Sequence, residues 1–220
     1  SVRSTSNAFK QLLLRLGAPE GRKVESDFVV PGFVHRLAGW QKALYLSTLL
    51  GAEMSAPAAM TAKNLYCPEL TQTRVAEQTD SGAQFMVDVA SLLGDLGVET
   101  NEVSRSETSS NAEHETLRFR LGVKNDSRNL IRFFTRIGYR YARSKQKRAL
   151  RAAQYLKLKE RAVEQRAAAA AEAKALADGG MGHRAVKQRV SGVNARFVER
   201  SINKLLERAV QSIGTHLDFE

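Results

Sequence analysis

The spacing of apolar residues predicts a mostly helical chain with strands in its middle part. Apolar residues recur every three or four positions, as in amphipathic helices, in four segments: residues 4–16, 40–54, 80–96 and 127–137. In residues 116–121 apolar and polar residues alternate, which predicts a strand with one apolar and one basic face. Residues 57–74 carry a weaker signal for two short extended pieces. Residues 139–177 are rich in Ala, Lys, Arg and Gln and contain no Pro or Gly, so one long helix, or two in succession, is expected.

The end of the chain has the pattern of two short helices around a tight turn. Val186 and Val190 precede a break at residues 191–194, and Phe197 and Ile202 follow it at helical spacing. Two short helices around a turn, after a longer helix, are typical of a helix-turn-helix. A small helical cap without nucleic-acid contact is the alternative.

The order of these elements predicts an α+β fold. Helix, two strands, helix, two strands (one within residues 97–108 and one over residues 116–121) and a further helix follow one another before the long helix and the tail begin. We therefore expect three parts. Residues 1–38 would form a linker or arm, residues 39–148 the main α+β unit, and residues 149–220 a helical, helix-turn-helix-like region.

The charge balance indicates a polyanionic partner. The 220 residues include 34 Lys and Arg against 23 Asp and Glu, a formal net charge of +11. Nucleic acid is the first candidate partner and an anionic membrane surface the second. A basic soluble protein without such a partner is the alternative.

Cysteine and histidine usage gives no sign of a disulfide or a zinc site. Cys67 is the single cysteine, so no disulfide within the chain and no cysteine-based zinc site is expected, and a reducing intracellular compartment fits. No apolar run reaches membrane-spanning length and no signal peptide is apparent. Ser1 stands where an initiator Met would, which indicates a chain processed or excised from a longer one. We expect the scattered histidines to be structural: His35, His114, His183 and His216.

The helix predicted over residues 40–54 is unusually thin on one side and ends in an acid. Ser47 and Gly51 are four residues apart, as are Thr48 and Ala52, so each pair forms a column of small side chains. Such a face lets a second backbone approach closely. Glu53 follows at the C-terminal end, where the helix dipole disfavours a carboxylate. It could hold a divalent metal together with a second acid, or it could simply be solvated in an ordinary helix bundle.

The segment "LSTLLGAEM" resembles the motif of LAGLIDADG homing endonucleases, in particular the endonuclease part of archaeal-type inteins. Further segments are similar to that family in the same order, including "LLLRLGAPEGRKVESDFVVPGFV", "LLGDLGVET" and "LRFRLGVKNDSRNLIRFFTRIGYRYARSK". The resemblance implies an αββαββα unit with a four-stranded antiparallel sheet that sits over DNA. One motif is present where an active site needs two. A homodimer or a second LAGLIDADG half is therefore expected.

The resemblance also implies roles for particular residues. Glu53, with Ala52 beside it, would hold Mg²⁺ or Mn²⁺, and the two small columns would form the helix–helix interface. A basic residue near the scissile phosphate would support the developing charge. The candidates for that role are Lys145, Lys124 and Arg128, with a phosphate contact or a surface charge as the alternative for each.

Two sets of basic and polar residues are candidates for DNA contact. The sheet would contribute Lys63, Gln72, Arg74, Arg105, Arg118 and Arg120, with ordinary solvated strand positions as the alternative. The basic long helix would contact phosphates through Arg143, Lys147 and Arg148, and the tail through Arg196, Arg200 and Lys204.

Together these observations predict a site-specific DNA endonuclease that hydrolyses phosphodiester bonds with Mg²⁺ or Mn²⁺, located in the cytoplasm with the nucleoid. The alternative is a catalytically inactive DNA-binding module on a degenerate scaffold of the same family. A structural or protein-interaction role comes third, because it leaves the basic surface unexplained.

Overall fold

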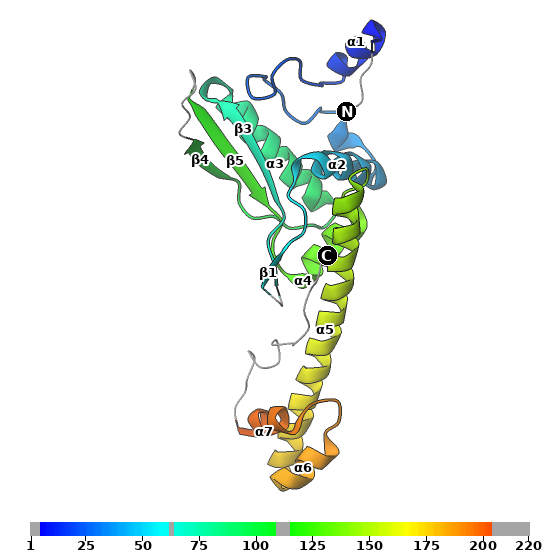
Figure 1. Cartoon of the computed structure of the whole chain (residues 1–220), viewed down its shortest axis with the longest axis vertical. Coiled ribbons are helices and arrows are strands. Elements are labelled where there is room, and N and C mark those ends of the chain that lie inside the picture. The colour runs from blue at the N-terminus through cyan, green and yellow to red at the C-terminus, as the bar shows by residue number, and fades with distance from the viewer. Residues whose placement is uncertain (1–4, 62–63, 109–114, 204–220) are drawn as a thin grey trace. The chain divides into compact units, whose positions relative to one another are not determined.

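A computed structural model of the chain describes residues 5–61, 64–108 and 115–203, and the fold is α+β (Figure 1). The helices are α1 (Asn7–Arg15), α2 (Gly39–Glu53), α3 (Thr79–Asp95), α4 (Ser127–Arg132), α5 (Arg143–Asp178), α6 (His183–Arg189) and α7 (Ala195–Asn203). Short 3₁₀ turns, η1 (Val34–Arg36) and η2 (Ala76–Gln78), and a π-helical turn, η3 (Phe133–Ile137), connect them. The strands are β1 (Ala59–Thr61), β2 (Asn64–Leu65), β3 (Glu69–Val75), β4 (Ser104–Thr108) and β5 (Thr116–Gly122).

The chain divides into two compact units. The first comprises Ser1–Pro57 and Tyr66–Leu150, and the second Ala58–Leu65 and Arg151–Glu220. The second unit therefore takes the short β1–β2 pair from the middle of the sequence. The division into residues 1–38, 39–148 and 149–220 stays a prediction.

A three-stranded antiparallel sheet with the order β3-β5-β4 organises the first unit. Leu70 pairs with Leu121 across β3 and β5, and Ser106 pairs with Arg118 across β4 and β5. One face of the sheet carries Leu70, Leu117, Phe119 and Leu121, all buried. Helix α3 runs behind β3 and β5 and covers this face (Figure 1).

Helices α2 and α3 lie close to the predicted ranges and bury apolar side chains. Helix α3 buries Phe85, Met86, Val89, Leu92 and Leu93. Those side chains meet the apolar positions of β3 and β5 and of α2, whose Leu46 and Leu50 are fully buried. Burial of so many large apolar side chains is the main favourable contribution to the stability of this unit.

The second unit has a small core of its own. Ala169 and Ala173 of α5 pack with Val186 and Val190 of α6 and with Phe197 and Val198 of α7. The predicted long helix and the two short helices after it are therefore confirmed, with α6 and α7 joined through the turn at residues 191–194. Assignment of the chain to an αββαββα unit stays a prediction. Four strands were expected in one sheet, and the described residues place three there and two in the separate β1–β2 pair.

Within the described residues, no helix combines the length and the apolar character that crossing a bilayer requires.

Candidate functional site

The uncovered face of the three-stranded sheet carries two arginines bordered by hydroxyl groups. Arg118 of β5 pairs with Thr73 of β3 and Ser106 of β4, and Arg120 pairs with Thr71 and Ser104 in the same way. Because side chains alternate between the faces of a strand, all six positions share the face opposite the apolar core. Each row therefore presents one guanidinium between two hydroxyls.

The six side chains of this face are half-buried or exposed, whereas Gln72 of β3 and Phe119 of β5, which lie between them, are buried. Glu69 holds Arg120 in place, with 3.8 Å between Nε and Oε1. Both partners are more than 40% exposed, so the pair orients the arginine and contributes little to stability. We call these six positions, Thr71, Thr73, Ser104, Ser106, Arg118 and Arg120, the hydroxyl–arginine face.

Three of the residues predicted to read DNA from the sheet lie elsewhere. Gln72 and Arg74 are 4% and 1% exposed and point to the helix-covered side of β3. Leu70 faces the core, and positions two and four residues later must face it too. Arg105 is exposed on the edge strand β4, opposite Phe119, so it belongs to the other side of the sheet from Arg118. Lys63 lies outside the described residues.

The C-terminal end of α2 brings together Glu53 and Lys145. The Glu53 carboxylate pairs with Lys23 at 2.8 Å, and the Lys145 ammonium donates to the Met54 carbonyl oxygen at 2.7 Å. Two cations thus lie at the negative end of the helix dipole, where they are stabilising. Lys145 acts here as a helix-capping donor.

The donor set at this helix end does not fit Mg²⁺ by itself. It offers one carboxylate that is already neutralised by an ammonium, and Ala52 beside it is exposed and contributes no side-chain oxygen. Among the described residues no group of three or more His, Cys, Asp and Glu side chains could hold a metal ion. The Mg²⁺ or Mn²⁺ cofactor stays a prediction.

The small residues of α2 divide into a buried and an exposed column. Ser47 and Gly51 are buried, and Thr48 and Ala52 are exposed. The Ser47 hydroxyl accepts from the Arg140 backbone N–H at 2.7 Å, and a Cβ on Gly51 would lie 3.4 Å from the Ala142 Cβ. The buried column is therefore occupied by the segment 139–142 of the same unit.

The turn that brings this segment back to α2 depends on Gly138. Its φ of +64° is in the left-handed region that favours glycine. The following Tyr139 is fully buried, stacks edge-on against Phe133 and donates from its hydroxyl to the Ser55 carbonyl oxygen at 3.0 Å. Burial raises the pKa of Tyr139, so its hydroxyl stays a donor at physiological pH.

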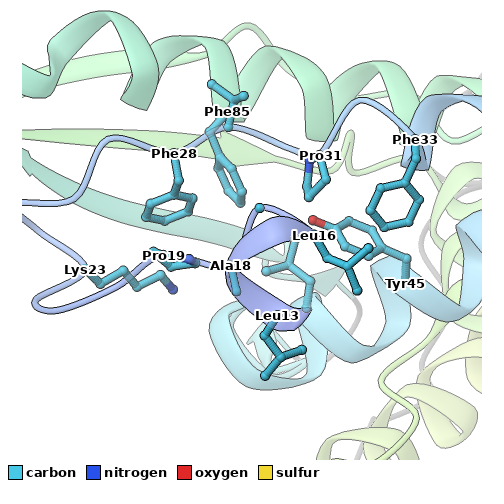
Figure 2. Close-up of a pocket in the computed structure, with 13 residues that line it drawn as sticks. Leu13, Leu16, Ala18, Pro19, Lys23, Phe28, Pro31, Phe33, Tyr45 and Phe85 are labelled. Atoms are coloured by element: carbon cyan, nitrogen blue, oxygen red, sulfur yellow. The ribbon is translucent and has the colours of Figure 1, made fainter. Parts of the chain in front are cut away.

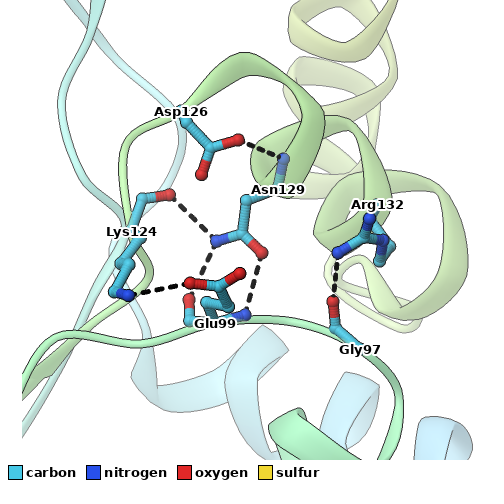
Figure 3. A network of polar contacts seen from close by, with 6 residues as sticks. All are labelled: Gly97, Glu99, Lys124, Asp126, Asn129 and Arg132. Carbon is cyan, nitrogen blue, oxygen red and sulfur yellow. Dashed lines mark hydrogen bonds and ion pairs between the residues drawn. The ribbon is translucent and has the colours of Figure 1, made fainter.

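Lys124 lies shortly before α4, in a polar network that Figure 3 shows, and Arg128 lies in the first turn of that helix. The Lys124 ammonium pairs with the Glu99 carboxylate at 2.7 Å, and the hydrogen bond from this ammonium, followed by its charge, lowers the pKa of Glu99. Beneath the exposed pair, Asn129 is 2% exposed and makes three hydrogen bonds to backbone groups of Glu99 and Lys124, at 2.8, 2.8 and 3.0 Å. Lys124 thus has an ion-pair partner, and the Asn129 side chain joins the two loops that contain Glu99 and Lys124.

The predicted phosphate-contact residues of the helices are exposed. Arg143, Lys147 and Arg148 lie on the first turns of α5, in the first unit, and Arg196 and Arg200 lie four residues apart on α7, in the second unit. Lys204 lies outside the described residues. All five therefore stay candidates for contact with a polyanion.

Sequence reasoning missed Asn129, Lys23 and the hydroxyl residues of the sheet. A polar residue inside the run "NLIRFF" gave a weak signal for Asn129, and no pattern linked Lys23 to Glu53. Thr71, Thr73, Ser104 and Ser106 could have been found by continuing the alternation of β5 to its neighbours.

Comparison with known proteins relates the chain to proteins named as tRNA-splicing ligases. The tRNA-splicing ligase RtcB of Methanopyrus kandleri is 34% identical over 224 residues, which covers 99% of this chain and 21% of that protein. The protein of the same name from Pyrococcus abyssi is 34% identical over 167 residues, covering 74% of this chain and 17% of that protein. A third, from Pyrococcus furiosus, is 29% identical over 202 residues, covering 91% and 20%. No protein-family model and no solved structure matches.

The chain thus spans about a fifth of the length of the curated relatives it matches. Their names contradict the interpretation as a LAGLIDADG homing endonuclease of an intein, because they describe ligases that act in tRNA splicing. The predicted DNA endonuclease activity, and the partners predicted with it, a long double-stranded DNA site and a second motif half, are wrong by the same finding. The alternative of an inactive DNA-binding module gains no support from these names.

The contradicted interpretation has a physical explanation in α2. The small residues that made "LSTLLGAEM" resemble a helix–helix motif are explained in part by packing inside the unit, since Ser47 and Gly51 accommodate the backbone of residues 139–142. The acid at the end of the motif has an ion-pair partner in Lys23. Neither feature needs a second motif.

Proposed function

We propose that this chain is an RNA-binding segment of a tRNA-splicing-ligase-like protein, and that the hydroxyl–arginine face contacts the RNA backbone. The observation that carries the proposal is the pairing of Arg118 and Arg120 with four Ser and Thr hydroxyls on one open sheet face. The names of the relatives favour RNA as the polyanion, and the net charge of +11 favours a polyanion of some kind.

The chemistry of the face suits sugar and phosphate groups more than bases. Arginine pairs with phosphate through parallel N–H donors, and Ser and Thr hydroxyls can bond to phosphate oxygens or to a 2′-hydroxyl. Sheets that read single-stranded RNA stack its bases on aromatic side chains. In the described part of this sheet the open face carries no aromatic ring, so we expect backbone contact with folded RNA and little sequence preference.

The basic residues at the start of α5 would extend this electrostatic attraction. Arg143 and Lys147 are exposed in the same unit. Contacts of this kind release counterions from the nucleic acid, so the affinity should fall steeply as salt is added. The relatives whose names describe ligation are about five times as long as this chain. We propose that this segment contributes RNA binding to ligation.

Replacing Arg118 and Arg120 together by glutamine should weaken binding to an unmodified tRNA transcript about 30-fold at low salt. Glutamine can still donate a neutral hydrogen bond, so a net loss of about 1 kcal/mol at each position corresponds to that factor. The slope of log Kd against log salt should also fall by about 1 for each phosphate that the variant no longer binds. Fluorescence anisotropy with labelled transcript, at two or more salt concentrations, measures both quantities.

A double variant with the same charge change is the matched control. Arg15 and Arg36 are exposed on α1 and η1 and lie outside the sheet, so Arg15→Gln with Arg36→Gln should change the Kd no more than about threefold. Equally weakened binding in the two double variants would reduce the effect to net charge and contradict the proposed face. Tighter binding of a DNA duplex than of the transcript would overturn the assignment of RNA as the partner.

A further inference from the structure

A largely apolar cavity of about 450 Å³ lies between the N-terminal arm and helices α2 and α3 of the first unit. Figure 2 shows the aromatic rings of Phe28, Phe33, Tyr45 and Phe85 around it, with Leu13 and Leu16 of the α1 region on the opposite side. Its volume is within the range of about 300–1,000 Å³ that is typical of small-molecule sites. The aliphatic and aromatic walls can take an apolar ligand body.

Two cations lie at one side of this cavity. The Lys23 side chain lines it, and the Lys23 backbone carbonyl oxygen accepts from Nη1 of Arg74 at 2.8 Å. The Arg74 guanidinium lies 4.0 Å from the centroid of the Phe28 ring, and Phe28 itself lines the cavity and packs edge-on against Phe85 at 5.4 Å. Arg74 therefore lies directly behind a wall residue of the cavity.

The charge of Arg74 is buried and makes no salt bridge among the described residues, and the carboxylate of Asp27 acts on it only at longer range. The side chain is 1% exposed, and its Nε and Nη2 atoms are buried with no hydrogen-bond partner there. Lys23, by contrast, already pairs with Glu53. Burying a guanidinium costs several kcal/mol unless it is paired, so an anion closer than Asp27 would stabilise Arg74. Burial accordingly lowers the pKa of Arg74, with partial compensation by the charge of Asp27.

The cavity also contains an unused hydroxyl group. The Tyr45 hydroxyl points into the group of side chains drawn in Figure 2 and has no hydrogen-bond partner among the described residues. It can donate to, or accept from, a polar atom of a bound molecule. The cavity therefore combines apolar walls with a small number of convergent polar groups, the arrangement that is usual for ligand sites.

We propose that this cavity binds a small organic anion with an apolar body, whose acidic group pairs with Arg74 beside Lys23. Phe28 belongs to the irregular segment between α1 and η1, so a rotation of its side chain would expose the guanidinium without disturbing a helix or strand. The apolar body would then contact Phe85, Leu49 and Tyr45. This site is separate from the hydroxyl–arginine face, because Arg74 and Arg118 point to opposite sides of the sheet.

The test uses 8-anilinonaphthalene-1-sulfonate, an apolar anion whose fluorescence rises on burial. Titration of the full chain should show one saturable site, and decanoate should displace the probe at least tenfold more effectively than decanol. Arg74→Met keeps the length and apolar stem of the side chain and removes the charge. It should weaken probe binding about tenfold, and Tyr45→Phe should weaken it less. Arg189→Met, an equal loss of charge on α6 in the second unit, should leave probe binding unchanged.

Two results would overturn the proposal: equal displacement by decanoate and decanol, or unchanged probe affinity in Arg74→Met. If Arg74→Met does not fold, as judged by circular dichroism, Ala18→Trp replaces it. Ala18 lines the cavity from the irregular arm, so a tryptophan there should fill the space and abolish probe binding without breaking a helix. Undiminished binding in that variant would place the probe elsewhere and likewise overturn the proposal.

Discussion

Replacing Asn129 by alanine should lower the free energy of unfolding by about 3 kcal/mol. The Asn129 side chain accepts from the Glu99 backbone N–H and donates to the carbonyl oxygens of Glu99 and Lys124. Alanine removes all three bonds and leaves buried backbone groups without partners, each at a cost of about 1 kcal/mol. The measurement is urea unfolding followed by circular dichroism, with the midpoint and slope fitted together.

Neighbouring substitutions separate this network from the charges above it. Asn129→Asp keeps the accepting oxygen but places a second oxygen against the carbonyl oxygens of Glu99 and Lys124 at a buried position, so at neutral pH it should destabilise the unit at least as much as alanine does. Lys124→Ala removes only the exposed pair with Glu99, which is worth little in water, and should change stability far less. Equal destabilisation by Asn129→Ala and Lys124→Ala would show that the ion pair, and not the buried amide, joins the two loops.

Helices α2 and α3 of the first unit could be predicted from the sequence because each buries an apolar stripe, whereas α1 buries none of its residues. Helix α3 was expected over residues 80–96 and spans Thr79–Asp95, with Phe85, Val89, Leu92 and Leu93 among its buried residues. The basic face of β5 followed from the same reasoning at period two, since Leu117 and Phe119 are buried between Thr116, Arg118 and Arg120. Local periodicity determines these features. A contact with a distant segment could change them only by moving the apolar side chains to the solvent face, which is energetically unfavourable.

In strand β3 the polarity of a residue does not predict which face of the sheet it lies on. The strand's sequence "ELTQTRV" contains hydroxyl, amide and charged residues on both faces, and Gln72 and Arg74 were therefore assigned from the sequence to the solvent face. The alternation that starts at buried Leu70 sends both inward, where Arg74 packs on Phe28 and next to Gly82. The partner of Arg74 comes from an arm some fifty residues earlier in the chain, and sequence spacing carries no information on such a contact.

Helix α2 shows the corresponding limit for a motif. Two columns of small residues indicate that some backbone approaches closely, and they do not indicate which one. In this chain the buried column faces residues 139–142, about ninety positions later, because the turn at Gly138 returns that segment to α2. The names of the relatives contradict the endonuclease function that the motif had implied. The close backbone approach that the small residues indicate is present, between α2 and residues 139–142.

A leucine at position 51 should therefore destabilise the first unit by about 3 kcal/mol. A Cβ on Gly51 would meet the Ala142 Cβ at 3.4 Å and the Tyr139 backbone at 3.7–3.8 Å. The single side-chain carbon of alanine therefore fits, and the three further carbons of leucine do not. Overpacking a buried contact costs about 1–3 kcal/mol or more. Gly51→Ala should be close to neutral, because the gain in helix propensity of about 1 kcal/mol offsets a tight but tolerable contact.

The adjacent position supplies the matched control. Ala52 lies on the same helix turn in the exposed column, so Ala52→Leu should change the free energy of unfolding by no more than about 0.5 kcal/mol. Thermal and urea unfolding of the three variants measure the differences. Gly51→Leu should also weaken the hydrogen bond from Arg140 to Ser47, because both join the same two segments, and amide hydrogen exchange at Arg140 should become faster. Equal stability of the two leucine variants would show that the segment 139–142 is not held against α2, and the packing explanation of the small-residue columns would then fail.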